Sequence, residues 1–171
     1  MNENRSDACA VRYGNKILII AGFTGLEVLA STEVYDPTDN TWTFGPRLNI
    51  PRSGLKAAVL NNKIYAIGGF NGHQRLKSVE TLDLLAPTHS WTLMTSEMRK
   101  TRSNFGVAII DKKILVAGGY DGRRVIGETE FYSEETNTWS SYQEMNSPKS
   151  ALSLITVTGL PNRKDYLVQR Q

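Results

Sequence analysis

Residues 63–72 read KIYAIGGFNG, a short apolar run that leads into two glycines and then an aromatic residue. Two other segments repeat this pattern: residues 15–25 read NKILIIAGFTG and residues 112–122 read KKILVAGGYDG. The second position of the glycine pair is Gly22, Gly69 and Gly119 in the three segments, at spacings of 47 and then 50 residues. Self-similarity at a period of this length indicates a protein built from repeated structural units.

Other residue types recur in register with these glycines. An arginine precedes the glycine by 17 residues, a glutamate follows it by 11, and a tryptophan lies beyond the glutamate. These residues are Arg5, Arg52 and Arg102; Glu33, Glu80 and Glu130; and Trp42, Trp91 and Trp139. The extra residues of the longer spacing lie between Glu80 and Arg102, so the sequence predicts one repeat with a local insertion.

Each unit reads as four short strands. In the second unit we expect strands at residues 55–60, 64–67, 78–82 and 91–93, with NNK at 61–63 as a tight hairpin turn. The run 64–67 is apolar on both faces, so neighbouring sheets must cover it on both sides. A four-stranded unit of about 45–50 residues that cannot bury both faces alone is typical of a β-propeller blade. The repeats therefore predict an all-β fold.

In the order of these features the sequence resembles the kelch repeat, whose signature is a glycine pair, an aromatic residue and a tryptophan. Gly68–Gly69 and Gly118–Gly119 match it fully, whereas Ala21 replaces the first glycine before Gly22. We expect close backbone packing at the glycines, packing between blades at the tryptophans, and a salt bridge to a glutamate at the arginines. The structural residues are Gly22, Gly68, Gly69, Gly118, Gly119, Trp42, Trp91, Trp139, Arg5, Arg52 and Arg102.

The resemblance predicts three blades at about residues 5–46, 52–96 and 102–144, a C-terminal strand at about 150–157 and a tail at 158–171. Closed propellers need about four to eight blades, so we expect a partial kelch-type β-propeller, about half of a six-bladed ring. An open arc exposes a blade face and an unpaired strand edge. The chain is therefore expected either to be a fragment or to complete its ring with a second half-propeller.

Residues 101–111 read TRSNFGVAIID and residues 150–160 read SALSLITVTGL, and both segments resemble the C-terminal end of the kelch-like family. In that family BTB and BACK domains accompany the propeller and the protein serves as a substrate adaptor of cullin-3 ubiquitin ligases. This resemblance implies a protein–protein interaction module that binds a protein or peptide substrate. No BTB or BACK segment is recognised in the 171 residues, so any link to cullin-3 depends on domains absent from this sequence. Two alternatives stay open: an actin-binding or other cytoskeletal kelch module, and a truncated fragment without function.

The same resemblance implies which positions contact the substrate: the residue after the repeated arginine, the aromatic after the glycines, and the position five beyond that aromatic. Val28 and Val125 are apolar at this last position, where a polar contact often sits. Arginines in the adjoining loops can bind carboxylates through two parallel hydrogen bonds, so we predict an acidic peptide partner. The expected substrate-binding residues are Ser6, Phe23, Ser53, Phe70, Arg75, Ser103, Tyr120, Arg124 and Ser150.

Composition argues against several other functions. The net charge is only +3 and the basic residues are scattered, so neither a nucleic acid nor a membrane is expected as a partner. Cys9 is the single cysteine, which excludes an intramolecular disulfide and favours a cytoplasmic location. His73 and His89 lack metal-ligand spacing, and the glycine pairs lack the context of a phosphate-binding loop. We therefore expect no metal, no cofactor and no enzymatic activity.

Overall fold

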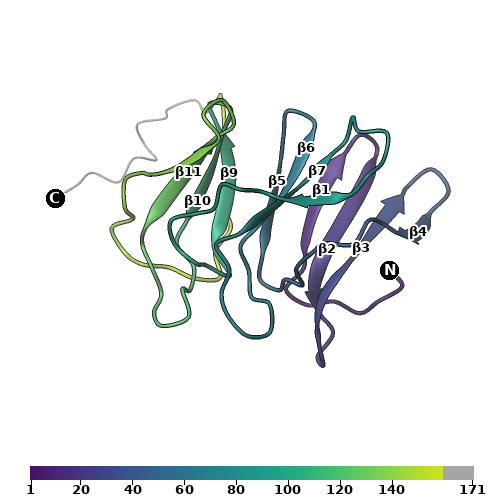
Figure 1. Cartoon of the computed structure of the whole chain (residues 1–171), viewed down its shortest axis with the longest axis horizontal. Coiled ribbons are helices and arrows are strands. Elements are labelled where there is room, and N and C mark those ends of the chain that lie inside the picture. Colours follow the sequence, from purple (N-terminus) through teal and green to yellow (C-terminus); the bar gives the residue numbers. More distant parts are fainter. Residues whose placement is uncertain (160–171) are drawn as a thin grey trace.

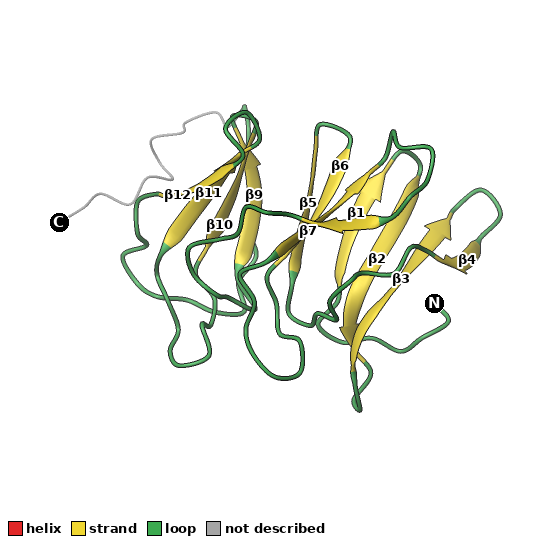
Figure 2. Ribbon diagram, in the orientation of Figure 1, coloured by secondary structure: helices red, strands yellow, loops and turns green. Residues whose placement is uncertain are grey.

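The computed structural model describes residues 1–159, which form twelve strands in three four-stranded antiparallel sheets. Within each sheet the strands follow chain order, so each sheet is a meander formed by one sequence repeat. The sheets stand side by side in the order of the sequence, and no helix occurs in the described part of the chain (Figure 1 and Figure 2). The predicted all-β fold and its three four-stranded units are confirmed.

We call the three sheets blades 1, 2 and 3. Blade 1 comprises β1 (Cys9–Tyr13), β2 (Lys16–Phe23), β3 (Val28–Asp36) and β4 (Thr41–Phe44). Blade 2 comprises β5 (Lys56–Leu60), β6 (Lys63–Ile67), β7 (Val79–Asp83) and β8 (Trp91–Leu93). Blade 3 comprises β9 (Gly106–Ile110), β10 (Lys113–Ala117), β11 (Thr129–Ser133) and β12 (Thr138–Ser141). The strands expected in the second unit agree with blade 2 to within one residue at each end.

Tight turns join the first two strands of each blade. Asn61 and Asn62, which connect β5 to β6, have φ angles of 46° and 60°. Asp111 and Lys112 adopt the same left-handed conformation between β9 and β10, with φ of 48° and 58°. Two such residues in succession are typical of a type I′ hairpin turn, and asparagine tolerates this conformation better than most residues. The turn predicted from NNK is confirmed.

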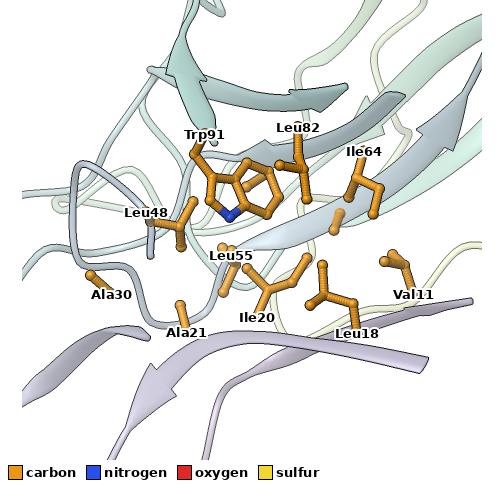
Figure 3. Close-up of a cluster of buried hydrophobic side chains, with 12 residues drawn as sticks. Val11, Leu18, Ile20, Ala21, Ala30, Leu48, Leu55, Ile64, Leu82 and Trp91 are labelled. Atoms are coloured by element: carbon orange, nitrogen blue, oxygen red, sulfur yellow. The ribbon is translucent and has the colours of Figure 1, made fainter. Parts of the chain in front are cut away.

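The hydrophobic core lies between neighbouring blades. Ile64 and Ala66 of β6 belong to a buried cluster shared with blade 1, whereas Tyr65 and Ile67 of the same strand belong to a cluster shared with blade 3. Figure 3 shows the first cluster, in which side chains of blades 1 and 2 point toward one another and Trp91 lies among them. Burying one large apolar side chain contributes about 1.5–3 kcal/mol. Each blade therefore depends on its neighbours for stability.

The two outermost faces of the arc lack this cover. On blade 1, Ile17 is 39% exposed, whereas its counterpart Ile64 in blade 2 is fully buried. On blade 3, Tyr142 is 62% exposed. It borders a depression of about 160 Å³ together with Ile110, Asp111, Lys113, Leu115 and Phe131. Within residues 1–159, no further blade covers either face.

The strand predicted at residues 150–157 is wrong, because no strand occurs there in the structure. The segment nevertheless lies against blade 3: the Ala151 N–H donates to the Asn104 carbonyl at 2.8 Å, and the Thr156 hydroxyl to the Ile109 carbonyl at 2.7 Å. A strand requires a continuous ladder of backbone hydrogen bonds, and the described residues supply no partner strand at this place. Of the tail predicted at 158–171, positions from 160 onward lie outside the described residues.

Candidate functional site

A buried ion pair between the repeated arginine and glutamate anchors each blade. Arg52 and Glu80 have fully buried side chains, and the distance from Arg52 Nη2 to Glu80 Oε1 is 3.1 Å. Arg52 Nη1 also donates to the carbonyls of Gly68 at 2.8 Å and Ser78 at 3.0 Å. Equivalent distances are 3.1 Å for Arg5–Glu33 and 2.7 Å for Arg102–Glu130. A buried guanidinium needs such compensation, so these arginines belong to the scaffold.

Blade 1 differs because its arginine has a second acidic partner. Arg5 pairs with Glu3 at 2.7 Å as well as with Glu33. Burial alone would raise the pKa of Glu33, but hydrogen bonds from the N–H groups of Asn2 and Glu3 and from Arg5 outweigh it and lower the pKa. The charged form of Glu33 is therefore the one that the fold stabilises.

The second glycine of each pair lets adjacent blades meet backbone to backbone. The Gly69 N–H donates to the carbonyl of Arg102 in the following repeat at 2.9 Å. Gly69 has a φ of 99°, which side chains rarely adopt, and a β-carbon there would lie 2.9 Å from the Ser53 carbonyl oxygen. The same contacts recur at Gly22 and Gly119. In each blade, the glycine at the end of the second strand therefore lets the serine that follows the repeated arginine approach that strand closely.

The first position of each pair also has left-handed backbone. Gly68 and Gly118 have φ angles of 57° and 65°, and Ala21 keeps the conformation at 58°. A residue with a β-carbon costs about 1–2 kcal/mol in this conformation. The departure of Ala21 from the kelch pattern therefore changes the strain at this position but not the path of the chain.

The tryptophans occupy two kinds of environment. Trp91 and Trp139 are buried in the clusters between blades, and Trp91 Nε1 donates to the Pro46 carbonyl of the preceding repeat at 3.0 Å. Trp42 is half-buried and packs on Tyr35, with ring centroids 5.0 Å apart. Since no blade precedes blade 1 within the described residues, one side of Trp42 stays open.

This scaffold brings most of the predicted contact residues together in pairs. Isolated antiparallel bridges join Ser6 to Phe23, Ser53 to Phe70, and Ser103 to Tyr120. We call these six residues the serine–aromatic face. Each serine follows a buried arginine, and each aromatic follows a glycine pair or, in blade 1, Ala21–Gly22, so the rigid scaffold holds the pairs at equivalent positions of successive blades.

Arg75 joins the serine–aromatic face from the loop that follows Phe70. Its guanidinium carbon lies 4.1 Å from the ring centroid of Phe70 and 5.2 Å from that of Tyr120 in the next repeat. Its Nε donates to the Ser103 hydroxyl at 2.9 Å. Stacking on two rings and one hydrogen bond orient the guanidinium before a ligand arrives. No acceptor within residues 1–159 binds Nη1 or Nη2, so both nitrogens can serve a ligand.

A small polar pocket opens beside Arg75. It has a volume of about 160 Å³ and is lined by residues from all three repeats: Asp7, Ser53, Gly54, Phe70, Arg75, Ser103 and Asn104. We call it the Arg75 pocket. The Gly54 N–H donates to the Asp7 carbonyl, and the Asn104 N–H donates to the Gly54 carbonyl, each at 2.8 Å. A β-carbon at Gly54 would overlap Asn104 Oδ1, so the glycine makes room for that amide.

Two predicted contact residues belong neither to the serine–aromatic face nor to this pocket. The Arg124 side chain is 70% exposed and pairs with Glu128 at 3.3 Å. Ser150 follows Lys149, whose carbonyl accepts the Gly119 N–H at 2.8 Å, and it does not line the pocket. The structure therefore separates Arg75, which is oriented by neighbouring side chains, from Arg124, which projects into solvent.

Asp7 and Asn104 escaped the prediction from sequence. Both lie two residues after a repeated arginine, at the position that Gly54 and Ala151 occupy in the other repeats. All four have left-handed backbone, with φ between 52° and 59°. Asparagine, aspartate and glycine favour this conformation, and their recurrence at one position was the signal that could have located it.

The described residues contain no group of three or more histidine, cysteine, aspartate or glutamate side chains arranged to hold a metal ion. No helix among them is long and apolar enough to cross a bilayer. The serine–aromatic face and the Arg75 pocket present hydroxyls, aromatic rings, one guanidinium and one carboxylate. Aromatic and arginine side chains beside polar groups are typical of surfaces that bind other proteins.

Comparison with known proteins gives consistent matches. A family model described as the KLHDC2/KLHL20/DRC7 Kelch-repeats domain matches residues 3–168. An F-box/kelch-repeat protein of Arabidopsis thaliana is 31% identical over 177 residues, which cover 97% of this chain and 47% of the relative. Kelch-like protein 28 of Homo sapiens is 32% identical over 150 residues, which cover 86% of this chain and 19% of the relative.

Among solved structures, that of YjhT matches with a TM-score of 0.74, covering 85% of this chain and 54% of that chain. At 14% sequence identity this likeness concerns the fold alone. The chain spans about half or less of the length of these relatives. Together with the three sheets, the matches confirm the predicted fold, a part of a kelch-type β-propeller.

Proposed function

Because the chain belongs to the kelch-repeat family, we propose that it is a protein–protein interaction module whose serine–aromatic face binds an acidic peptide of its partner. Kelch repeats generally act as interaction modules and not as enzymes. The observation that carries the proposal is the guanidinium of Arg75, stacked on Phe70 and Tyr120 with its Nε bound to Ser103.

The available nitrogens of Arg75 suit a carboxylate. Arginine binds a carboxylate through two parallel hydrogen bonds, and hydrogen bonds to charged groups contribute about 1.5–3 kcal/mol. Ser53 also lines the Arg75 pocket and can add a hydroxyl contact to the peptide. Phe70 and Tyr120 offer ring surface to its apolar parts. One acidic residue is therefore expected to raise the affinity of a peptide by about tenfold or more.

Fluorescence anisotropy with two labelled peptides tests this proposal. The peptides differ only in glutamate against glutamine, and the full chain is expected to prefer the glutamate peptide by about tenfold. Arg75→Gln is expected to remove this preference. Arg47→Gln is the matched control, because Arg47 is exposed and lies outside the Arg75 pocket. An unchanged preference in Arg75→Gln contradicts the proposal.

The cellular role that we propose is the substrate-reading part of a cullin-3 ubiquitin ligase adaptor in the cytoplasm. Its support is the resemblance of residues 101–111 and 150–160 to the C-terminal end of kelch-like protein 10, and the match to kelch-like protein 28. BTB and BACK domains outside these 171 residues would supply the cullin-3 contact. Cullin-3 should co-precipitate with this chain fused to a BTB–BACK segment. Equal co-precipitation by the 171-residue chain alone contradicts that role.

We further propose that a second half-propeller completes the ring. The support is the pair of uncovered outer faces, with Ile17 and Trp42 on blade 1 and Tyr142 on blade 3, and the segment 151–157 that has no partner strand within the described residues. Covering apolar faces of this kind is favourable. Sedimentation velocity of the chain is expected to show association that increases with concentration. A monomer at every concentration contradicts this assembly.

A further inference from the structure

The Arg75 pocket is lined by two residues of opposite charge from different repeats, and the proposed function uses only one of them. Arg75 follows β6 of blade 2, whereas Asp7 precedes β1 of blade 1, and the other polar side chains of the pocket are neutral. We propose that the pocket selects a peptide in which an acidic residue stands next to a basic one, with the acid at Arg75 and the base at Asp7. This inference rests on the proposed function, because it concerns the same face.

The volume of the pocket limits what can occupy it. At about 160 Å³ it is well below the roughly 300–1,000 Å³ of sites that enclose drug-sized ligands. A pocket of this size admits the ends of one or two side chains. The rest of the peptide lies outside the pocket, along the serine–aromatic face.

Asp7 places its carboxylate on a constrained stretch of backbone. Its φ is 52°, and its carbonyl accepts the Gly54 N–H at 2.8 Å, so the backbone at this point is tied to the next repeat. The carboxylate has one hydrogen-bond donor among residues 1–159, the Ser6 hydroxyl at 3.5 Å. No lysine or arginine of the described chain forms a salt bridge with Asp7. Its charge is therefore available to a basic group of a ligand.

Arg75 attracts a ligand that carries only acidic groups, whereas Asp7 repels it. A second carboxylate beside the one at Arg75 is repelled by Asp7, whereas an ammonium or guanidinium group in the same place is attracted. Each interaction between exposed charges changes a binding constant by up to about fivefold at low salt. The two effects act in the same direction, so a peptide with a basic neighbour is expected to bind about fivefold more tightly than one with an acidic neighbour.

Five blocked hexapeptides test the inference. Each carries one pair at the centre of a glycine background: Glu-Lys or Glu-Gln, each made in both orders, or Glu-Glu. The backbone amide NMR signals of Gly54 and Asn104 report binding to the full chain, because both residues line the Arg75 pocket and remain in every variant. The chain is expected to bind the better Glu-Lys order about fivefold more tightly than Glu-Glu. Asp7→Asn is expected to reduce this ratio to within about twofold. Glu135→Gln removes an exposed charge outside the pocket and should leave the ratio unchanged.

The outcomes separate this inference from the proposed function. If the wild-type chain binds Glu-Lys and Glu-Glu equally while Arg75→Gln loses all the peptides, only the pairing of charges is overturned. The same holds if Asp7→Asn keeps the wild-type ratio, provided that its urea midpoint shows an intact fold. If Arg75→Gln binds the peptides as the wild-type chain does, or if no peptide binds, both proposals fail.

Discussion

Replacing Glu80 with glutamine removes one charge from an ion pair that is fully buried. Arg52 then keeps its positive charge with only carbonyl and hydroxyl oxygens and the new amide as partners. Removing one member of a buried pair costs about 3–5 kcal/mol. Glu80 also accepts the N–H groups of Asn49 and Ile50, and the single glutamine oxygen can keep only part of these bonds. We therefore expect a loss of about 3–5 kcal/mol in the free energy of unfolding.

Glu33→Gln is the matched control for this experiment, because Arg5 retains Glu3 at 2.7 Å after the change. The side chain of Glu3 is 34% exposed, so solvent screens this second pair in part without removing it. We expect Glu33→Gln to cost at least about 1 kcal/mol less than Glu80→Gln. Urea unfolding at neutral pH, followed by tryptophan fluorescence, measures both losses. Equal losses, or a loss below about 1 kcal/mol for Glu80→Gln, would refute the reasoning.

The remaining predictions also concern stability. Gly69→Ala should cost about 1–3 kcal/mol more in the free energy of unfolding than Gly25→Ala, measured by thermal melts. Both glycines have φ near 100°, but only Gly69 faces a carbonyl oxygen at 2.9 Å. Equal costs contradict this close contact. Trp91→Ala should cost about 3–5 kcal/mol in the free energy of unfolding, measured by urea titration. Trp42→Ala should cost less than half of that, because Trp42 is only half-buried whereas Trp91 is buried. Similar values contradict the open outer face of blade 1. Folding lowers the pKa of Glu33, so its contribution to stability is complete above the ordinary value of 4.5 and is lost as the pH falls through the lowered pKa. Glu33→Gln should flatten this part of the pH dependence of the free energy of unfolding. A variant as sensitive to acid as the wild-type chain contradicts the predicted lowering of the Glu33 pKa.

Sequence reasoning located the strands of blade 2 to within one residue, because several repeated positions impose local conformations. Asn61 and Asn62 favour a type I′ turn, and Gly69 suits a positive φ and a close backbone contact. The strand predicted at 150–157 failed because its apolar residues do not determine whether a partner strand is present. The two arginines predicted to bind an acidic peptide could not be told apart, since their loops look alike in sequence.

The sequence by itself determined the repeating unit and its four strands, since the residue types that bend, bury and pair the backbone recur at fixed intervals. Only the tertiary structure decided which side chains form the pocket. Arg75 reaches Ser103 across 28 residues of chain, and Asp7 meets Gly54 and Asn104 through bonds between repeats. These contacts follow from the way in which blades pack on one another. The repeat period places Asp7, Gly54 and Asn104 at equivalent positions, but only the packing brings them into one pocket.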